Sequence, residues 1–388
     1  MIKPRIKIAL FTTSRAEFGI LYPLIKQMSV KGGIKPLLFV GGAHLVSECG
    51  KTINEIINCG INIQDIFDYL LNGDDSFSIS KSFGIAVCEL AHIFRDYAFD
   101  FVCVLGDRFE LLAIVNNAII FKKPIIHISG GEETTGVIDE QVRHMITKAA
   151  HLHFVSCKEY AENLLKMGEP AWRITNTGSL NVDNIVKQNR IPKKRLFEEL
   201  NLDIRKPTIL MTYHPGTLEY SISLEQQIMN IFEALELFDL QAVITAPNIE
   251  VDYNKIILCI KDVVGTNNNL HYFESLGFQK YHSLIPHCEF VIGNSSSGIV
   301  EVPYFKVPTV NIGDRQNGRI RHKSVIDTDY STESIRAGIK KALSANFRSS
   351  LKGMKFKFGD GHAAERMVEI IRKTDINQEF LRKQLVFK

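Results

Sequence analysis

The stretch from Phe101 to His144 constrains the fold of this chain more than any other. Two short apolar runs, Phe101 to Leu105 and Pro124 to Ile128, each stop at a polar turn with glycine, and a helix-like pattern follows each run. Short β-branched runs that alternate with helices are typical of buried parallel strands joined by right-handed crossovers. The pattern therefore predicts a parallel sheet with helices packed on both faces.

The residues that follow these two runs are the candidates for chemistry. Gly106-Asp107-Arg108 follows the first run, and Ser129-Gly130-Gly131 with Glu132 follows the second. Ligands of open α/β sheets bind beyond the carboxyl ends of the strands, so we expect both turns to share one crevice with Asp139 and His144. Carboxylates, an arginine and a histidine in one crevice indicate an acid–base site. The plainer interpretation is that both turns only join strand to helix and that Asp139 caps a helix.

The same alternation runs through the rest of the chain. A helix is predicted over 80–96, and strands are predicted at 5–11, 35–40, 152–155, 208–213, 241–246, 290–293 and 309–312. A polar, basic segment at 188–195 interrupts the pattern and is typical of a domain boundary. The prediction is an α/β fold of two doubly wound, Rossmann-like domains that face each other across a cleft. They comprise residues 1–179, joined by a C-terminal helix over 366–388, and residues 180–365.

Composition excludes several classes of partner. The net charge of +3 is not gathered into a basic stripe, so no nucleic acid is expected. We expect no segment to approach the ~20 apolar residues of a membrane span, and we expect no signal peptide in the short apolar run near the N-terminus. The seven cysteines are scattered without CxxC pairs, which disfavours both a zinc site and a disulfide framework. The expectation is a cytoplasmic protein with no metal and no membrane partner.

The serine-rich turn from Gly293 to Gly298 is the main feature of the second half. Backbone N–H groups at a helix start and three serine hydroxyls are typical of an anion site, here for the diphosphate of a nucleotide-sugar. Glu301 is then expected to accept hydrogen bonds from the ribose. The turn lacks the Gly-Lys-Ser/Thr of a Walker A loop, which disfavours ATP hydrolysis. The alternative is an ordinary serine-rich helix cap.

Two further residues follow predicted strands in this half. His214 stands at the end of the strand at 208–213, and Arg315 follows the strand at 309–312. Arg315 is a candidate for compensating phosphate charge. A lone histidine is more often structural than catalytic, but its position at a strand end in the same domain as the serine turn favours a role in the site.

Taken together, these motifs resemble the hydrolysing UDP-N-acetylglucosamine 2-epimerases, in the branch that serves sialic-acid synthesis. They occur in one order between Lys7 and Arg321, and they are Thr13 to Glu17, Gly106 to Glu110, His127 to Glu132, Ile138 to Lys148, His214-Pro215, Pro247-Asn248, Gly293 to Gly298 and Arg315 to Arg319. The resemblance implies a GT-B-like fold, a UDP-sugar substrate, a homodimer, and a reaction without metal or NAD.

The resemblance also implies roles for individual residues. Catalytic roles fall to Asp107, Glu132, Asp139 and His214. The residues implied in binding the UDP-sugar are Arg15, Ala16, Arg108, Arg143, His144, Asn248, Gly293, Asn294, Ser295, Ser296, Ser297, Glu301 and Arg315. One position departs from the family pattern: many members have a glutamate two residues after the histidine at 127, where this chain has Ser129. The base at C2 is then Glu132 or Asp107.

The implied reaction begins with loss of UDP from C1 and of the proton from C2, which leaves a glycal. Water then adds to give free N-acetylmannosamine. The same reaction on UDP-2,4-diacetamido-2,4,6-trideoxyglucose, toward legionaminic acid, is an open alternative. A UDP-sugar glycosyltransferase shares the fold, but it needs fewer carboxylates and an acceptor groove. A nucleotide-sugar sensor without catalysis has no use for Asp107 and Asp139.

Overall fold

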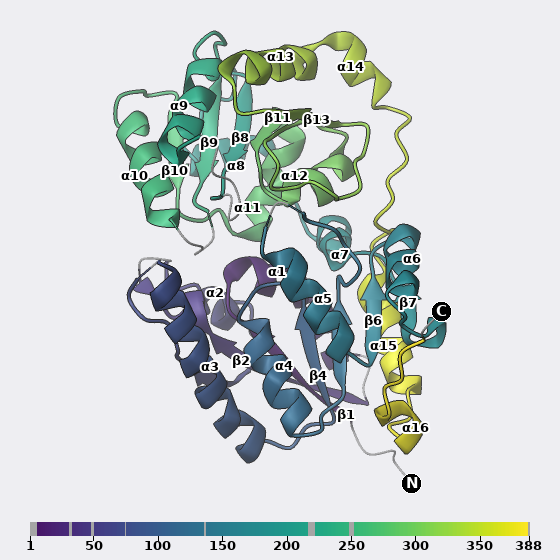
Figure 1. Ribbon diagram of the computed structural model, residues 1–388. Helices are drawn as coiled ribbons and strands as arrows, with labels where there is room; N and C mark the ends of the chain where they lie inside the picture. The colour runs from purple at the N-terminus through teal and green to yellow at the C-terminus, as the bar shows by residue number, and fades with distance from the viewer. Residues whose placement is uncertain are drawn as a thin grey trace. The chain divides into compact units, whose positions relative to one another are not determined.

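The computed structural model describes residues 6–30, 33–47, 50–73, 75–135, 137–215, 222–247 and 252–386. The chain divides into two compact units, which are described separately (Figure 1). Unit 1 comprises Met1–Glu132, Asp139–Lys187 and Lys357–Lys388. Unit 2 comprises Glu133–Ile138 and Gln188–Phe356.

These boundaries lie a few residues from those expected at 179/180 and 365/366. Residues 180–187 belong to unit 1 because they form helix α7 (Leu180–Lys187), which packs against α1 (Arg15–Val30) and α15 (Ala363–Lys373). Residues 357–365 belong to unit 1 as well, since they lead into α15. A short segment earlier in the chain, 133–138, packs with unit 2 instead, where the Thr135 N–H donates to the Asn317 carbonyl at 3.0 Å.

Unit 1 is built on a seven-stranded parallel sheet in the order β3-β2-β1-β4-β5-β6-β7. Its strands are β1 (Ile6–Thr12), β2 (Ile34–Gly41), β3 (Ile63–Phe67), β4 (Phe101–Leu105), β5 (Ile125–Ile128), β6 (Leu152–Val155) and β7 (Ile174–Asn176). Its further helices are η1 (Gly42–His44), α2 (Ile53–Asn58), α3 (Ser76–Asp96), α4 (Leu111–Ile120), α5 (Asp139–Ala149), α6 (Lys158–Lys166), η3 (Ala171–Arg173) and α16 (Gln378–Leu381). The strand order reverses between β1 and β4, which is the usual ligand position in doubly wound sheets.

Strand β4 shows why the sheet is buried on both faces. All five of its residues are buried, and they alternate between two apolar cores. Phe101, Cys103 and Leu105 face the core that includes α1 and α15, whereas Val102 and Val104 face the core that includes α3 and α4. A continuous apolar run is what a parallel strand covered on both sides requires.

Helix α3 corrects two expectations: that no segment approaches the apolar length of a membrane span, and that this helix begins at residue 80. Among the described residues it is the one helix long and apolar enough to cross a membrane by length and composition alone. The pattern predicted only 80–96, but the Asp75 side chain accepts hydrogen bonds from the N–H groups of Phe77 and Ser78, so the helix begins at Ser76. One face of α3, including Ala86, Leu90 and Phe94, packs into the core of unit 1.

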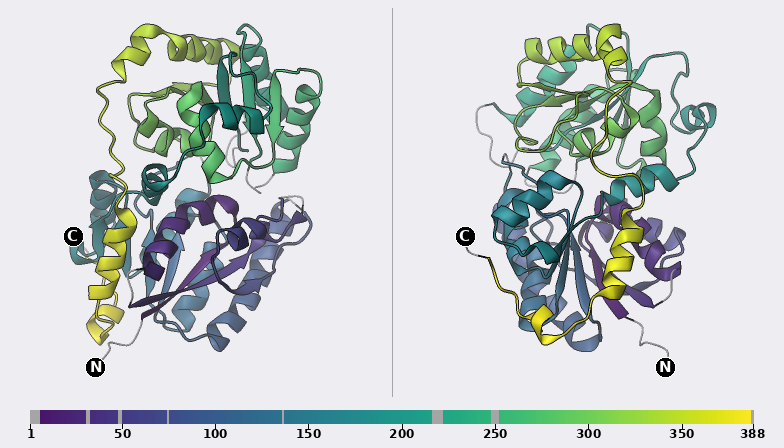
Figure 2. Two further views of the ribbon diagram at one scale, coloured as in Figure 1. Left: turned by 180° about the vertical axis from the view of Figure 1, so that it is seen from behind. Right: turned by 90° about the vertical axis from the view of Figure 1, so that its right-hand side faces the viewer.

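The C-terminal helix is shorter than the predicted 366–388. Helix α15 ends at Lys373, and α16 starts separately behind Asn377, whose side chain accepts the Phe380 N–H at 2.8 Å. Figure 2 shows from two sides that α15 returns to unit 1, although it is far from α1 in the sequence. Met367, Val368 and Ile371 of α15 complete the core beneath α1.

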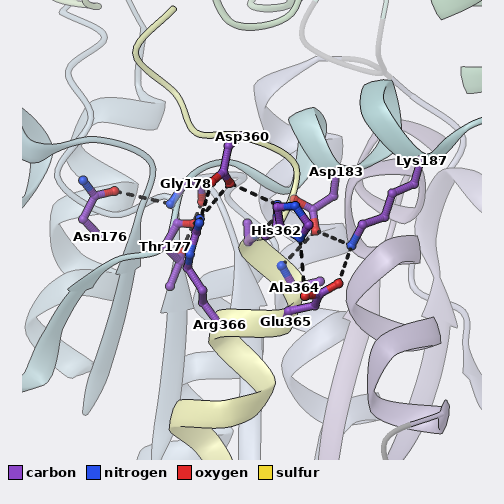
Figure 3. A network of polar contacts seen from close by, with 11 residues as sticks. Asn176, Thr177, Gly178, Asp183, Lys187, Asp360, His362, Ala364, Glu365 and Arg366 are labelled. Atoms are coloured by element: carbon purple, nitrogen blue, oxygen red, sulfur yellow. Dashed lines mark hydrogen bonds and ion pairs between the residues drawn. The ribbon is translucent and has the colours of Figure 1, made fainter.

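A buried carboxylate fixes the start of α15 (Figure 3). Asp183 of α7 is fully buried and accepts hydrogen bonds from the N–H groups of Ala363 at 2.8 Å and Ala364 at 2.9 Å. Toward solvent, Lys187 bridges Asp183 and Glu365. These contacts join two segments of unit 1 that are about half the chain apart, so α15 is held by a cap from another helix.

Unit 2 repeats the topology with six parallel strands in the order β10-β9-β8-β11-β12-β13. The strands are β8 (Thr208–Thr212), β9 (Gln241–Thr245), β10 (Leu270–Phe273), β11 (Cys288–Gly293), β12 (Thr309–Ile312) and β13 (Val325–Thr328). The helices are α8 (Lys193–Glu199), α9 (Leu224–Leu235), α10 (Tyr253–Val264), α11 (Gly277–Leu284), η4 (Ile285–His287), α12 (Ser297–Val300), η5 (Val302–Phe305), α13 (Thr332–Leu343) and α14 (Ala345–Ser350).

The core of unit 2 also lies on both faces of its sheet. In β11, Phe290 and Ile292 face one apolar cluster, and Cys288 and Val291 face the other. The strand order reverses between β8 and β11, so the residues after Thr212 and Gly293 meet at the reversal point. The predicted fold class, two Rossmann-like parallel α/β units, is confirmed.

Candidate functional site

A buried arginine organises the polar turns of unit 1. Arg143, on the first turns of α5, has no exposed side chain. Its Nη1 donates to the Glu132 carbonyl oxygen at 2.9 Å and to Glu140 Oε2 at 2.7 Å, and its Nη2 donates to Asp107 Oδ2. The turns after β4 and β5 are thereby tied to one helix.

The charge on Arg143 is maintained by its neighbours. Burial by itself would lower the pKa of the guanidinium, but the charges of Asp107 and Glu132 outweigh burial and raise that pKa. Arg143 was predicted to bind substrate, and here its contacts are to groups of the protein that carry the proposed chemistry. Its observed role is to hold Asp107 and the Glu132 main chain close together.

His127 also holds the turn after β4 in place. The ring is fully buried in β5, with Nε2 2.8 Å from the Gly106 carbonyl and Nδ1 3.2 Å from Thr147 Oγ1. A carbonyl only accepts, so Nε2 carries the proton and Nδ1 accepts from the hydroxyl. Burial lowers the pKa of His127 to about 3, which keeps the ring neutral. The histidine therefore fixes the turn that presents Asp107.

The turn after β5 is tightly wound. Ser129, at the position where the family pattern has glutamate, adopts a left-handed conformation with φ 67°. Gly131 has φ 77°, and a Cβ at this position would lie 2.4 Å from the Tyr160 carbonyl oxygen. Glu132 follows as a buried residue. The turn thus requires glycine at 131 and places Glu132, with Asp107, around Arg143.

The other predicted residues of unit 1 lie on the same polar edge with different surroundings. Asp139 is the first residue of α5 and is partly exposed, and Glu140 Oε1 lies 2.8 Å from Nε2 of His144. Arg15 begins α1 and is partly buried, and Ala16 beside it is exposed. The Nε of Arg108 donates a hydrogen bond to Glu110 Oε1 at 2.9 Å.

The reversal point of unit 2 is closed by a pair of amide hydrogen bonds. Asn294 Oδ1 accepts the His214 N–H at 2.7 Å, and Asn294 Nδ2 donates to the His214 carbonyl at 2.8 Å. Gly293 before it has φ 130°, and a Cβ there would lie 2.0 Å from the Thr212 carbonyl oxygen. Only glycine allows β11 to approach β8 this closely. His214 and Asn294, both predicted for the site, are therefore brought together.

The serine turn is more compact than expected. Helix α12 has only four residues, so a helix dipole contributes little to the anion site expected here. The hydroxyls of Ser295 and Ser297 lie 3.3 Å apart, and Ser297 also contacts the Tyr281 hydroxyl. Ser296, just before the helix, is exposed, whereas Ser295 and Ser297 are partly buried. The turn offers hydroxyl and N–H donors without a long helix behind them.

Two charged residues of unit 2 have partners in the protein. Glu301 Oε2 lies 2.9 Å from Nε2 of His282, a buried histidine. Arg315 is buried and its Nη1 lies 3.4 Å from the Asn294 carbonyl, to which Gln316 Nε2 donates at 2.8 Å. Arg315 is thus adjacent to the pair formed by His214 and Asn294. Asn248, the remaining predicted ligand, lies outside the described residues.

Sequence reasoning gave no role to four residues that the structure places at these edges. His127, Glu17 and Glu110 stand within the motifs that carry the family resemblance, and His282 supports Glu301. A histidine inside an apolar strand run was the available signal for His127. In the part of the chain that the structure describes, no three His, Cys, Asp or Glu side chains are grouped as a metal site.

The fold and the two polar edges define a two-domain α/β protein of the GT-B-like class. The model of the UDP-N-acetylglucosamine 2-epimerase family matches residues 26–372. The chain therefore belongs to this family, as its motifs predicted.

Individual relatives have narrower names. The chain is 36% identical, over 84% of its length and 85% of the relative, to a GDP/UDP-N,N'-diacetylbacillosamine 2-epimerase (hydrolyzing) of Campylobacter jejuni. It is 32% identical, over 94% of its length and 93% of the relative, to the polysialic acid biosynthesis protein P7 of Escherichia coli. The crystal structure of the Neisseria meningitidis UDP-GlcNAc 2-epimerase bound to UDP-GlcNAc matches with a TM-score of 0.82 at 17% identity, covering 95% of this chain and all of that one.

Proposed function

We propose that this protein is a hydrolysing UDP-sugar 2-epimerase. The observation that carries the proposal is the cluster in which buried Arg143 holds Asp107, Glu140 and the Glu132 main chain at the carboxyl ends of two adjacent strands. A carboxylate-rich strand edge suits proton transfer at a carbon beside the anomeric centre. The name of the 36% identical relative supports the hydrolysing form of the reaction.

The first step is an elimination. The C1–O bond breaks and its electron pair leaves with UDP, while a carboxylate takes the C2 proton and the C2–H electrons form the C1=C2 double bond. The C2 proton is only weakly acidic, so the charge that develops on UDP must be stabilised. In unit 2, Arg315, His214, Asn294 and the serine turn supply positive charge and N–H or O–H donors for that purpose, and Glu301 accepts from the ribose. In unit 1, Arg15, Ala16, Arg108 and His144 complete the proposed contacts to the substrate.

The second step is hydration. Water adds its oxygen to C1, and C2 receives a proton on the face opposite to the one that lost it, so the free sugar is epimerised. Asp107, Glu132 and Asp139 are the proposed proton-transfer groups, because Ser129 leaves no carboxylate at the position used in the family pattern. No metal or nicotinamide takes part in the proposed steps.

Two sugars are candidates for the substrate. The relative in Campylobacter favours UDP-N,N'-diacetylbacillosamine, which is the 2,4-diacetamido-2,4,6-trideoxy sugar considered above. The family description favours UDP-N-acetylglucosamine, with N-acetylmannosamine as product. The name of the polysialic acid biosynthesis protein of Escherichia coli supports a place in sialic-acid synthesis. We further propose that the protein is cytoplasmic and forms a homodimer, as the resemblance to the family implies. Comparing turnover of the two UDP-sugars by one preparation distinguishes the candidates.

Isotope labelling tests the reaction itself. In D₂O the free manno sugar should carry deuterium at C2, and in H₂¹⁸O the label should enter the sugar at C1 and be absent from UDP. A glycosyltransferase acting as a hydrolase would release the gluco sugar with its C2 hydrogen retained. A nonhydrolysing epimerase would return a UDP-sugar. A product without deuterium at C2 would contradict the elimination.

A further inference from the structure

Two buried glutamates lie behind the turn that carries Asp107. Glu17 of α1 is 6% exposed, and Glu110, just before α4, is 3% exposed. The Thr13 hydroxyl stands between them, with Oγ1 2.6 Å from Glu17 Oε2 and 3.0 Å from Glu110 Oε1. Neither glutamate has a place in the elimination and hydration described above.

The number of protons available between Thr13 and the two glutamates limits their charge states. A hydroxyl has one proton and donates one hydrogen bond, so Thr13 satisfies only one of the two carboxylates. If both glutamates were ionised, the second contact would bring two acceptor oxygens together without a proton. A proton on one of the glutamates removes this conflict.

The charges around Glu17, Thr13 and Glu110 also indicate that one of the two glutamates carries a proton. Arg108 is the cation that contacts it, with Nε 2.9 Å from Glu110 Oε1, and Tyr69 places its hydroxyl 3.5 Å from the same oxygen. Glu17 Oε2 instead receives uncharged donors, the N–H groups of Thr13 at 2.8 Å and Ser14 at 3.0 Å. Two buried like charges beside one guanidinium are unfavourable. Because Arg108 pairs directly with Glu110, the ionised member is Glu110.

We propose that Glu17 keeps its proton in the folded protein and through it donates a hydrogen bond to the Thr13 hydroxyl, which donates to ionised Glu110, which in turn holds Arg108. Arg108 follows Asp107 directly in the chain, so the series fixes the turn on which Asp107 stands. Glu17 and Glu110 are positioning residues, and their effect on turnover rests on the proposed function. Burial raises the pKa of Glu17; the charge of Arg108 opposes this rise and that of Glu110 adds to it.

Turnover of two matched variants tests the assignment of the proton. Glu17→Gln replaces a protonated carboxyl with a neutral group that still donates, so kcat should fall by no more than about threefold. Glu110→Gln removes the charge opposite Arg108, so kcat should fall by about tenfold or more with a smaller change in KM. Equal losses in the two variants, or a larger loss in Glu17→Gln, would overturn the assignment.

A second measurement does not depend on catalysis. A pKa raised in the folded state stabilises the protein fully below the unfolded value of about 4.5, and this stabilisation is lost as pH rises toward the folded pKa. The folded-to-unfolded ratio of the wild type, relative to Glu17→Gln, should therefore fall by up to about tenfold per pH unit above 4.5. Glu89→Gln, on the exposed face of α3, is the control and should follow the wild type.

The two measurements separate the inference from the proposed function. A wild type that turns over neither UDP-sugar contradicts the proposed function, while the pH comparison still decides where the proton lies. Parallel pH profiles of wild type and Glu17→Gln would show that Glu17 is ionised in the folded protein and would overturn the inference. An infrared C=O band of a protonated carboxyl, lost in Glu17→Gln, is the expected direct signature.

Discussion

At the scale of single residues, buried polar groups at the strand ends serve mainly to hold other polar groups. Arg143 ties Asp107 to the main chain of Glu132, His127 anchors the carbonyl of Gly106, and Asn294 clamps His214. Each of these side chains is buried, and a buried polar group left unpaired costs about 1–3 kcal/mol. The positions of the groups proposed to react are thus set by contacts that would be costly to break.

The Asp107→Asn variant tests, at this scale, whether Asp107 is a proton-transfer group as proposed. Asparagine has nearly the same size but no basicity, so the rate of UDP release should fall by roughly 10²–10⁴. UDP affinity, measured by calorimetry, should change little. Asp96→Asn, at an exposed ion pair with Arg95, is the matched control and should keep the wild-type rate. A near-normal rate in Asp107→Asn would remove this residue from proton transfer.

At the scale of elements, helix ends are fixed by side chains that are distant in sequence. The start of α15 is capped by Asp183 of α7, and the carbonyls of Thr147 and Ala150 at the end of α5 accept hydrogen bonds from Lys383 at 2.8 and 2.6 Å. Cations near helix C-termini and carboxylates near N-termini are favourable. The C-terminal part of unit 1 thus helps to hold the helix that bears Arg143.

The Asp183 cap is testable by stability. Asp183→Ala leaves the N–H groups of Ala363 and Ala364 without their acceptor, and we expect a loss of about 1–2 kcal/mol in the free energy of unfolding. Urea unfolding followed by circular dichroism measures it. Lys187→Ala, which removes only the outer ion pairs of the same network, should cost less than about 1 kcal/mol. A smaller loss for Asp183→Ala than for Lys187→Ala would contradict the cap.

At the scale of the whole molecule, acid should destabilise the fold through histidines buried in the neutral state. His44 lies between the hydroxyls of Thr12 and Thr52, and burial lowers its pKa to about 4. The pKa of His127 is lowered to about 3 and that of His151 to about 4, in both cases chiefly by burial. In the unfolded chain these rings take up protons near pH 6.5.

The sign of the pH dependence follows from these lowered values. A histidine that binds its proton less readily when folded stabilises the protein above pH 6.5 and loses that contribution as pH falls toward 4. Each group contributes a slope of up to about 1.4 kcal/mol per pH unit in that window. We expect the free energy of unfolding to fall between pH 6.5 and 4.5, and to fall less steeply in His44→Gln. Equal slopes in the two proteins would show that His44 is not held neutral.

The sequence by itself determined the fold class and the family, and it gave the turns at which the chemistry is proposed. These depend on local patterns: apolar runs of strand length, glycine turns after them, and motifs in a fixed order. Weak strands such as β3 and β7, the early start of α3 and the break between α15 and α16 were missed, since their limits depend on caps and on packing. The roles of Asp107, Glu132, Asp139 and the UDP contacts stay predictions.

Only the tertiary structure decided which buried groups contact one another or share a cap. Thr13 and Glu110 are 97 positions apart, and Asp183 and Ala363 are 180 apart, so no local pattern could pair them. Burial adds the physical reason: it changes the proton affinity of a carboxyl or an imidazole, and sequence alone does not say which glutamate or histidine is buried beside which charge. The packing of unit 1 is what buries the three neutral histidines, wholly or in part, and places Glu17 and Glu110 on either side of the Thr13 hydroxyl.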